Sequence, residues 1–140
     1  MKRLLLQTRI LMDDQLRPHG VTTAQMQVLF AVRAEPGSSG AQLARSCYIT
    51  PQTTQALLKH LEDRGLIVRG KDAVNDRIVT ARITPEGERL ARMVEKLSSS
   101  MQEDLWRGVS DRELARLEKL MALCLGNLGG LAEDPEANCR

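Results

Sequence analysis

The sequence predicts a mainly α-helical protein that carries one small β-hairpin. Apolar residues recur at spacings of three and four over most of the chain, which is the period of an amphipathic helix. Between residues 66 and 83 the pattern changes to two β-branched runs, 66–69 and 78–83, on either side of a polar, charged segment. Such a pair of runs is typical of a hairpin. Aromatic residues make up only 2% of the chain, so the core must rest on aliphatic side chains.

Length and charge narrow the class of protein. A chain of 140 residues suits one compact domain, or a small domain with an attached oligomerisation element. Residues 39–82 hold seven basic and four acidic side chains, whereas residues 83–140 hold eight and eleven. The middle of the chain could therefore face a polyanion, and the acidic end should not.

The cysteines and the apolar runs indicate a cytoplasmic protein. Cys47, Cys124 and Cys139 are odd in number and lie far apart, which suits a reducing compartment. No apolar run approaches the roughly 18 residues that a membrane span needs. Residues 1–14 are basic and then apolar but lack a small-residue cleavage site, so we interpret them as an amphipathic helix and not as a signal peptide.

Start signals divide the first fifty residues into three helices. Leu4, Leu5, Ile10, Leu11 and Leu16 can form one face of the first helix, which Pro18 and Gly20 end. Thr22-x-x-Gln25 predicts a capping box for the second helix, and Ser39-x-x-Gln42 predicts one for a short third helix. The segment EPGSSG separates the second helix from the third.

The stretch CYITPQTTQALLKHLEDRGLIVRG, residues 47–70, predicts a fourth helix with a largely apolar inward side and a polar outward side. Thr50 is placed to cap it, with Pro51 at the first helical position. At 100° per residue the inward stripe consists of Thr54, Leu57, Leu58 and Leu61. The outward side is polar or small and holds Gln52, Thr53, Gln55, Ala56, Lys59, His60 and Asp63.

Two further helices follow the hairpin. In the second strand Val79, Ala81 and Ile83 alternate with Thr80 and Arg82, so we expect the first set to pack and the second to face solvent. Thr84-Pro85 starts a long helix, and Ser110-x-x-Glu113 starts a final one. Their Leu and Met stripes exceed what one chain could easily cover, which indicates a dimer interface shared with the first helix. Residues 129–140 are expected to form a flexible tail.

The outward side of the fourth helix suits the major groove of DNA. Gln can pair with adenine, Thr offers a methyl group to thymine, and helix N-terminal N–H groups suit phosphate. A short helix, a tight turn, this helix and a charged hairpin make a winged helix-turn-helix. Arg77 at the hairpin tip could enter a narrow minor groove, and Arg69, Lys71 and Arg82 could meet phosphates. An ordinary solvated helix face is the alternative interpretation, which the neighbouring turn and hairpin disfavour.

The chain resembles the MarR family of bacterial transcription regulators over nearly its whole length. The resemblance rests on Leu43-Ala44, on Thr50-Pro51-Gln52-Thr53, on LEDRGLIVR at 61–69 and on ITPEG at 83–87. The family's Asp-x-Arg wing signature reads Asn75-Asp76-Arg77 here, so Arg is retained and Asp is replaced by Asn. The resemblance implies an obligate homodimer, a pseudo-palindromic DNA site, and repression that a small molecule relieves.

Two alternative functions remain beside this interpretation, and one possible effector site belongs to it. A winged-helix module could bind protein and not DNA, and salt-sensitive duplex binding would separate the two. Cys47 could be a redox sensor, although its inward position favours simple packing. Arg17 and His19, near the joint of the first two helices, could bind an anionic effector, although a solvated loop is the simpler interpretation. His19 and His60 are too few for a zinc site, and we expect no metal, no cofactor and no catalytic residue.

The sequence thus predicts a winged helix-turn-helix domain plus a helical dimerisation region. We expect a dimerisation helix at 1–20, a DNA-binding domain at 21–84, dimerisation helices at 85–128 and the tail at 129–140. The expected DNA contacts come from both sides of the helix-turn-helix and from the hairpin: Ser39, Thr50, Gln52, Thr53, Gln55, Ala56, Lys59, His60, Arg69, Lys71, Arg77 and Arg82.

Overall fold

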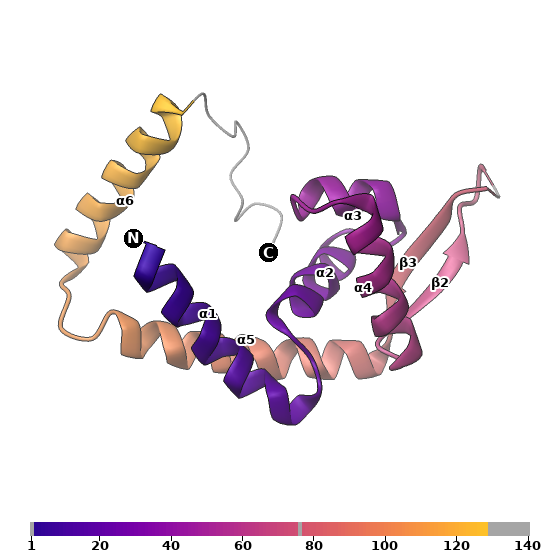
Figure 1. The fold of residues 1–140 in the computed structure, drawn as a ribbon, viewed down its shortest axis with the longest axis horizontal. Helices are drawn as coiled ribbons and strands as arrows, with labels where there is room; N and C mark the ends of the chain where they lie inside the picture. The colour runs from indigo at the N-terminus through magenta and orange to yellow at the C-terminus, as the bar shows by residue number, and fades with distance from the viewer. Residues whose placement is uncertain (1, 76, 129–140) are drawn as a thin grey trace. The chain divides into compact units, whose positions relative to one another are not determined.

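A computed structural model describes residues 2–75 and 77–128 and contains six α-helices and a small sheet within these ranges (Figure 1). The chain divides into two compact units, and the boundary between them in the sequence lies between Ser98 and Ser99. In chain order the elements are α1 (Lys2–Leu16), a 3-10 turn η1 (Arg17–His19), α2 (Thr23–Ala34), β1 (Ser38–Ser39), α3 (Gly40–Ser46), α4 (Pro51–Asp63), β2 (Ile67–Lys71), β3 (Val79–Ile83), α5 (Pro85–Leu105) and α6 (Asp111–Asn127). The predicted tail at 129–140 lies outside the described residues.

The predicted helix starts are confirmed. Thr22, Ser39 and Ser110 each form a reciprocal capping box with the Gln or Glu three residues later. Thr50 caps α4 by accepting a hydrogen bond from the Thr53 N–H, and Pro51 occupies the first turn. Each box satisfies two backbone N–H groups, those of the capping residue and of the residue three positions later, which would otherwise be left to water.

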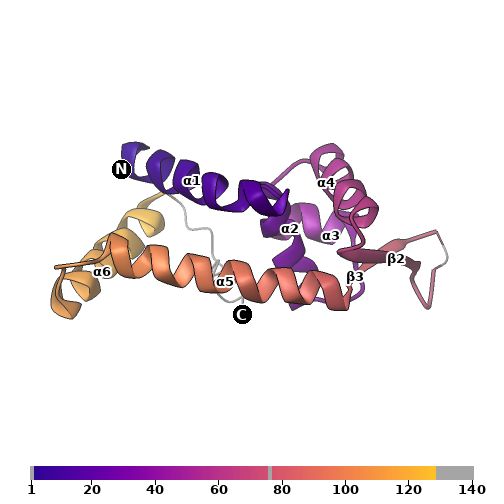
Figure 2. The same cartoon turned by 90° about the horizontal axis from the view of Figure 1, so that it is seen from below.

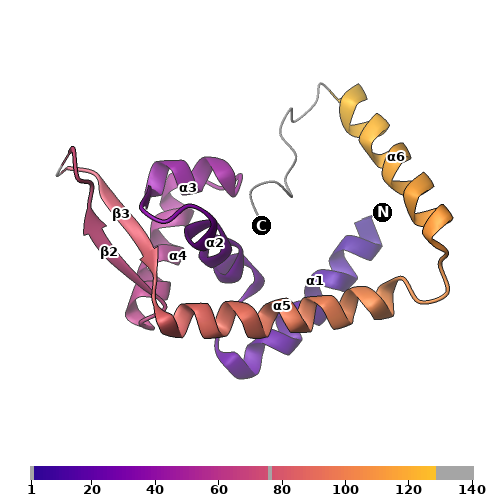
Figure 3. The same cartoon turned by 180° about the vertical axis from the view of Figure 1, so that it is seen from behind.

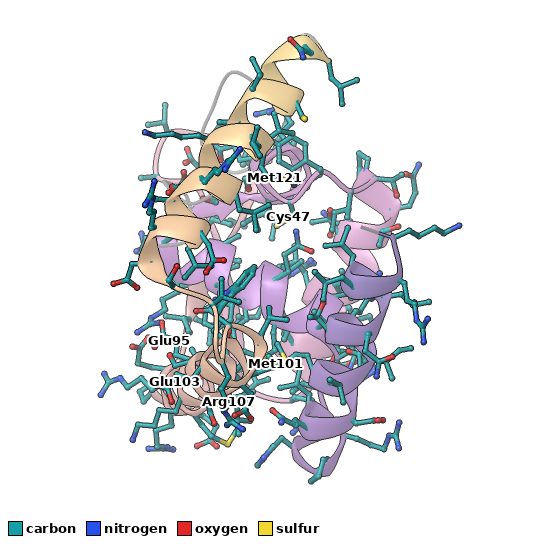
Figure 4. The ribbon with its side chains drawn as sticks, turned by 90° about the vertical axis from the view of Figure 1, so that its left-hand side faces the viewer. Cys47, Glu95, Met101, Glu103, Arg107 and Met121 are labelled. Carbon is teal, nitrogen blue, oxygen red and sulfur yellow. The ribbon has the colours of Figure 1, made fainter. Side chains whose placement is uncertain are left out.

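One aliphatic core holds the first unit together. Its fully buried large side chains come from α1, α2, α3, α4 and β2, and they include Leu16, Leu29, Leu43, Leu61 and Ile67. Cys47 is also buried, with 4% of its surface exposed (labelled in Figure 4). The packing interpretation of this cysteine therefore fits the structure.

The sheet contains one strand that the sequence did not predict. The strand order is β1-β3-β2, and β1 pairs only Ser38 with Ala81 and Ser39 with Thr80. Two residues from the EPGSSG breaker carry no β-branched pattern, so their pairing follows from the position of β3. Beyond β1 the two longer strands, β2 and β3, project as an arm (Figure 3).

The predicted alternation of β3 is wrong at two positions. Thr80 is buried, with 7% exposed, whereas Val79 is 49% exposed. The reason is the short partner strand: Thr80 lies between Ser39 of β1 and Gly70 of β2, but Val79 pairs only with Lys71 in the projecting part of the arm. Position along the arm therefore decides burial more than the face of the strand does.

An ion-pair cluster joins α2 to the first half of α5. One guanidinium nitrogen of Arg33 lies 2.8 Å from Glu88, and the other contacts Glu95. Glu88 also accepts a hydrogen bond from Arg92 at 3.2 Å. Desolvation opposes ionisation of Glu88, but the hydrogen bonds from the two arginines outweigh it and hold its pKa below the usual range.

Most apolar side chains of α6 are exposed in the single chain. They comprise Leu117, Leu120, Met121, Leu123 and Leu125. The same holds for Leu4, Leu5, Leu6, Ile10 and Leu11 on α1, where only Met12 and Leu16 are buried. No described helix is long and apolar enough to cross a membrane.

Gly87 is required where α5 begins, because a β-carbon there would overlap the carbonyl oxygen of Leu66. We predict that Gly87→Ala lowers the free energy of unfolding by about 1–3 kcal/mol, the usual range for overpacking. Urea unfolding followed by circular dichroism measures the change. Gly126→Ala in α6 is the control, because nothing lies within 4 Å of its added carbon; that change should leave stability equal or slightly higher. Equal losses in both variants would contradict the packing argument.

Asp13 ties α1 to the start of α2, since it accepts hydrogen bonds from the Thr23 hydroxyl and, at 2.8 Å, from the Thr23 N–H. These bonds hold the pKa of Asp13 below its usual 3.8. The stabilisation from these hydrogen bonds is therefore fully present above the usual pKa of 3.8, and it is lost as the pH falls through the lowered pKa of Asp13 in the folded protein. We predict that Asp13→Ala destabilises the protein by about 1 kcal/mol at pH 7, with the loss shrinking on acidification. Urea unfolding across this pH range tests it, and Asp14→Ala should show a smaller effect throughout.

Candidate nucleic-acid interface

The start of α4 is held rigidly and its outward side is open. Thr50 Oγ1 accepts the Thr53 N–H at 3.1 Å and lies 2.8 Å from the Thr53 hydroxyl. Thr54, fully buried, donates its own hydroxyl to the Thr50 carbonyl at 3.0 Å. The first turn therefore has a fixed geometry before any partner arrives.

The structure orients α4 as the sequence predicts. Thr54, Leu58 and Leu61 are buried, and Leu57 is half-buried. The whole predicted reading side is exposed: Thr50, Gln52, Thr53, Gln55, Ala56, Lys59 and His60. Besides Thr50 and Thr53, which bond each other, Lys59 pairs with Asp63 at 3.0 Å and Gln55 accepts a hydrogen bond from Arg69.

Ser39 stands at the start of α3, where the helix-turn-helix begins. Its hydroxyl accepts the Gln42 N–H at 3.3 Å, and its backbone belongs to β1. Ser39 is half-buried. Ser39 mainly caps α3, so only its exposed part could contact a phosphate.

The tip of the arm is built by side chains that accept backbone hydrogen bonds. Asp72 Oδ1 accepts from the Val74 N–H at 2.9 Å and from the Asn75 N–H at 3.0 Å. These two bonds hold the pKa of Asp72 below its usual value. Asn75 in turn accepts the Arg77 backbone N–H at 3.1 Å, so Asn supports the turn without engaging the Arg77 guanidinium. Asp72 is not among the site residues predicted from the sequence, although an Asp at the start of a polar tip is a known turn signal.

The four predicted cations of the arm fall into two groups. Lys71, Arg77 and Arg82 are exposed and can meet phosphates. Arg69 is only 24% exposed at its side chain and is turned toward α4 and Glu62. Figure 2 shows α4 beside the base of β2 and β3, from which the arm extends.

Arg17 and His19 lie in η1, away from the start of α4. Both are exposed, and Arg17 pairs with Asp14 at 2.6 Å. The Arg64 guanidinium, just beyond the end of α4, donates to the carbonyl of Gly20. Since α4 has 13 residues, its two ends are about 20 Å apart, so the structure does not bring these residues together with Thr50.

Tyr48 is the functional candidate that the sequence analysis did not select. It lies in the turn between α3 and α4, is 60% exposed and has a left-handed backbone, with φ 54°. It lines an open depression together with Ala41, Ala44, Arg45, Ile49, Thr50 and Pro51. A single aromatic residue in a turn carries no signal of this conformation, which glycine usually adopts.

Within residues 2–75 and 77–128, the structure gathers no group of three or more His, Cys, Asp or Glu side chains that could hold a metal ion. His60 is exposed on α4 and His19 is exposed on η1. The site therefore consists of hydrogen-bond donors, acceptors and cations, which are the groups that recognise a nucleic acid.

Comparison with known proteins agrees with this geometry. The sequence profile of the MarR family matches residues 19–78. The HTH-type transcriptional repressors Rv2887 of Mycobacterium tuberculosis and Mb2911 of Mycobacterium bovis are 33% identical over 102 residues, which cover 73% of this chain and 68% of each relative.

Solved structures share the fold. A crystal structure of a MarR family transcription regulator superposes with a TM-score of 0.84 at 23% identity, over 91% of this chain and 84% of that one. Streptococcus pneumoniae FabT in complex with DNA gives 0.80 at 20% identity, over 91% and 92% of the two chains. Together with the repressor relatives, the profile match and the shared fold show that the chain belongs to the MarR family of winged helix-turn-helix transcriptional regulators.

Proposed function

We propose that this protein is a sequence-specific DNA-binding transcriptional regulator that acts as a homodimer on a pseudo-palindromic operator. The observation that carries the proposal is the outward side of α4, which is capped, exposed and rich in Gln and Thr, next to an arm that displays Lys71, Arg77 and Arg82. Side chains of this kind on a helix start can read base edges, while the cations attract the phosphate backbone. No step of this function needs a catalytic group.

The roles divide by element. Gln52, Thr53, Gln55 and Ala56 of α4 read bases, whereas Thr50, Lys59, His60 and Ser39 position the protein on the backbone. Arg77 enters the minor groove from the tip of the arm. Residues 21–84 form the DNA-binding domain, and 1–20 with 85–128 form the dimerisation region, where α1 and α6 expose apolar side chains. In this proposal the protein binds its DNA site in the cytoplasm.

Repression relieved by a small molecule is part of the proposal. The relatives at 33% identity are named transcriptional repressors, which supports repression. Relief by a small molecule is what the resemblance to the MarR family implies. Arg17 and His19, exposed at the junction of α1 and α2, are the proposed effector contacts. The rival function, a protein-docking winged helix, lacks comparable support, because the FabT and MepR structures that share the fold are complexes with DNA.

Arg77 provides the test of the arm. We predict that Arg77→Ala weakens binding to most duplexes and lowers the slope of log affinity against log salt by about one unit, since one cation in contact with the DNA is lost. A salt titration of duplex binding by fluorescence anisotropy measures the slope. Arg89→Ala is the matched control, because it removes the same charge from an arginine that pairs with Glu86 on α5. A slope that stays at the wild-type value in Arg77→Ala would rule out a contact between the arm and the DNA at this residue.

The exposed apolar side of α6 provides the test of the dimer. Leu117 is 42% exposed in the single chain, so Leu117→Glu should leave each subunit folded but disfavour an apolar interface. We predict a shift to monomer in light scattering and weaker binding to a full operator, with unchanged helicity. Lys119→Glu on the same helix is the control for added negative charge. A Leu117→Glu protein that remained dimeric would show that α6 does not hold the subunits together.

A further inference from the structure

Gln55 and Arg69 form a tie between α4 and β2. Arg69 Nη2 donates a hydrogen bond of 2.8 Å to Gln55 Oε1. An arginine can only donate, so the amide oxygen of Gln55 must face it. The free rotation of an exposed glutamine is thereby removed, and the orientation of its amide is set by a residue of the sheet.

The contacts of the Arg69 guanidinium are with other residues of the protein. Its Nε lies 3.8 Å from a carboxylate oxygen of Glu62, and this nitrogen is buried without a hydrogen-bond partner among the described residues. Leaving a buried N–H unsatisfied is unfavourable, so the guanidinium is held here by its other contacts. A cation in this position is poorly placed to meet a phosphate, in contrast to Lys71 two residues later, which is exposed.

Gly40, the first residue of α3, leaves room for the Gln55 amide because it has no side chain. A β-carbon at this position would overlap the Gln55 amide nitrogen, which therefore lies directly over the glycine backbone. Three elements thus meet at one side chain that stays exposed: α3 through Gly40, α4 through Gln55 itself, and β2 through Arg69.

We propose that Arg69 is a positioning residue for base recognition, which holds Gln55 with its amide nitrogen as the edge offered to DNA. The inference rests on the proposed function. A glutamine that pairs with adenine in the usual two-bond way must present its oxygen and its nitrogen together. With the oxygen engaged by Arg69, Gln55 acts as a donor and favours a base acceptor, such as a purine N7 or thymine O4, over cytosine, whose major-groove edge offers a donor.

The test measures discrimination and salt dependence on the same proteins. An operator is first selected in vitro with the wild-type protein, and the affinity for every single-base variant of it is then measured. We expect Gln55→Ala and Arg69→Ala each to reduce discrimination at the same base pair by about ten-fold, the size of one base contact. The double variant should lose no more than either single one. The salt slope of Arg69→Ala should equal that of the wild type.

Two matched variants separate positioning from charge. Lys71→Ala, on the same strand, should lower the salt slope by about one unit and keep the base profile. Gly40→Ala changes no charge but displaces the Gln55 amide, so it should alter the base profile and keep the slope. If Arg69→Ala instead lowers the slope and keeps the profile, Arg69 is a phosphate contact and the proposal is overturned.

A readout without DNA keeps this proposal distinct from the proposed function. The Gln55 side-chain NH₂ signals in a ¹H–¹⁵N spectrum, assigned with Gln55→Ala, should move in Arg69→Ala and remain in place in Lys71→Ala. Signals that do not move in Arg69→Ala would show that the tie is absent. A wild-type protein that binds no duplex in a salt-dependent manner would overturn the proposed function, while the spectrum would still report on the tie.

Discussion

The rotation of α4 about its own axis is the constraint on which the rest depends. Thr54, Leu58 and Leu61 recur at helical spacing and are buried together, and a rotation of one residue would expose a leucine and bury a glutamine or a lysine. Both changes are unfavourable, the first by the lost apolar burial and the second by desolvation of polar groups. The Thr50 cap fixes where the helix starts, and the buried stripe fixes which way it faces. The chemistry of the outward side follows from these two facts.

The arm works by a different principle, because it has no core of its own. Beyond the pairing with β1 it consists of two strands, and a two-stranded hairpin is marginally stable by itself. Its order comes from the polar tip, where Asp72 and Asn75 accept three backbone N–H groups. Asp72 also places a negative charge near Lys71 and Arg77 in the sequence, so the carboxylate that shapes the tip reduces its net positive charge. The hydrogen bonds that Asp72 accepts are therefore obtained at some expense to phosphate attraction.

Helix starts, the hairpin and the direction in which α4 faces were predictable from the sequence, because each depends on local signals or on helical periodicity. Caps at Thr22, Ser39, Thr50 and Ser110 need only three neighbouring residues. The failures all involve tertiary context. β1 exists because β3 offers it an edge, and Thr80 is buried because two strands flank it. The direction of the Arg69 side chain, which bonds Gln55, also depends on the fold. The sequence does not indicate which basic residue of a strand is exposed. The fold shows that Lys71 is exposed and that Arg69 is half-buried and bonded to Gln55.

The spacing between two reading helices is not contained in a single chain. The helix-turn-helix buries its main aliphatic side chains in its own core, whereas α1 and α6 leave leucines exposed at 42% or more of their surface, among them Leu5 and Leu117. A second copy that covers these side chains would set the distance between the two α4 helices, which must match about 34 Å for one turn of the duplex. Base preference and half-site spacing therefore depend on separate sets of residues. Substitutions on α6 can alter the spacing and leave α4 unchanged, so the two properties can vary independently.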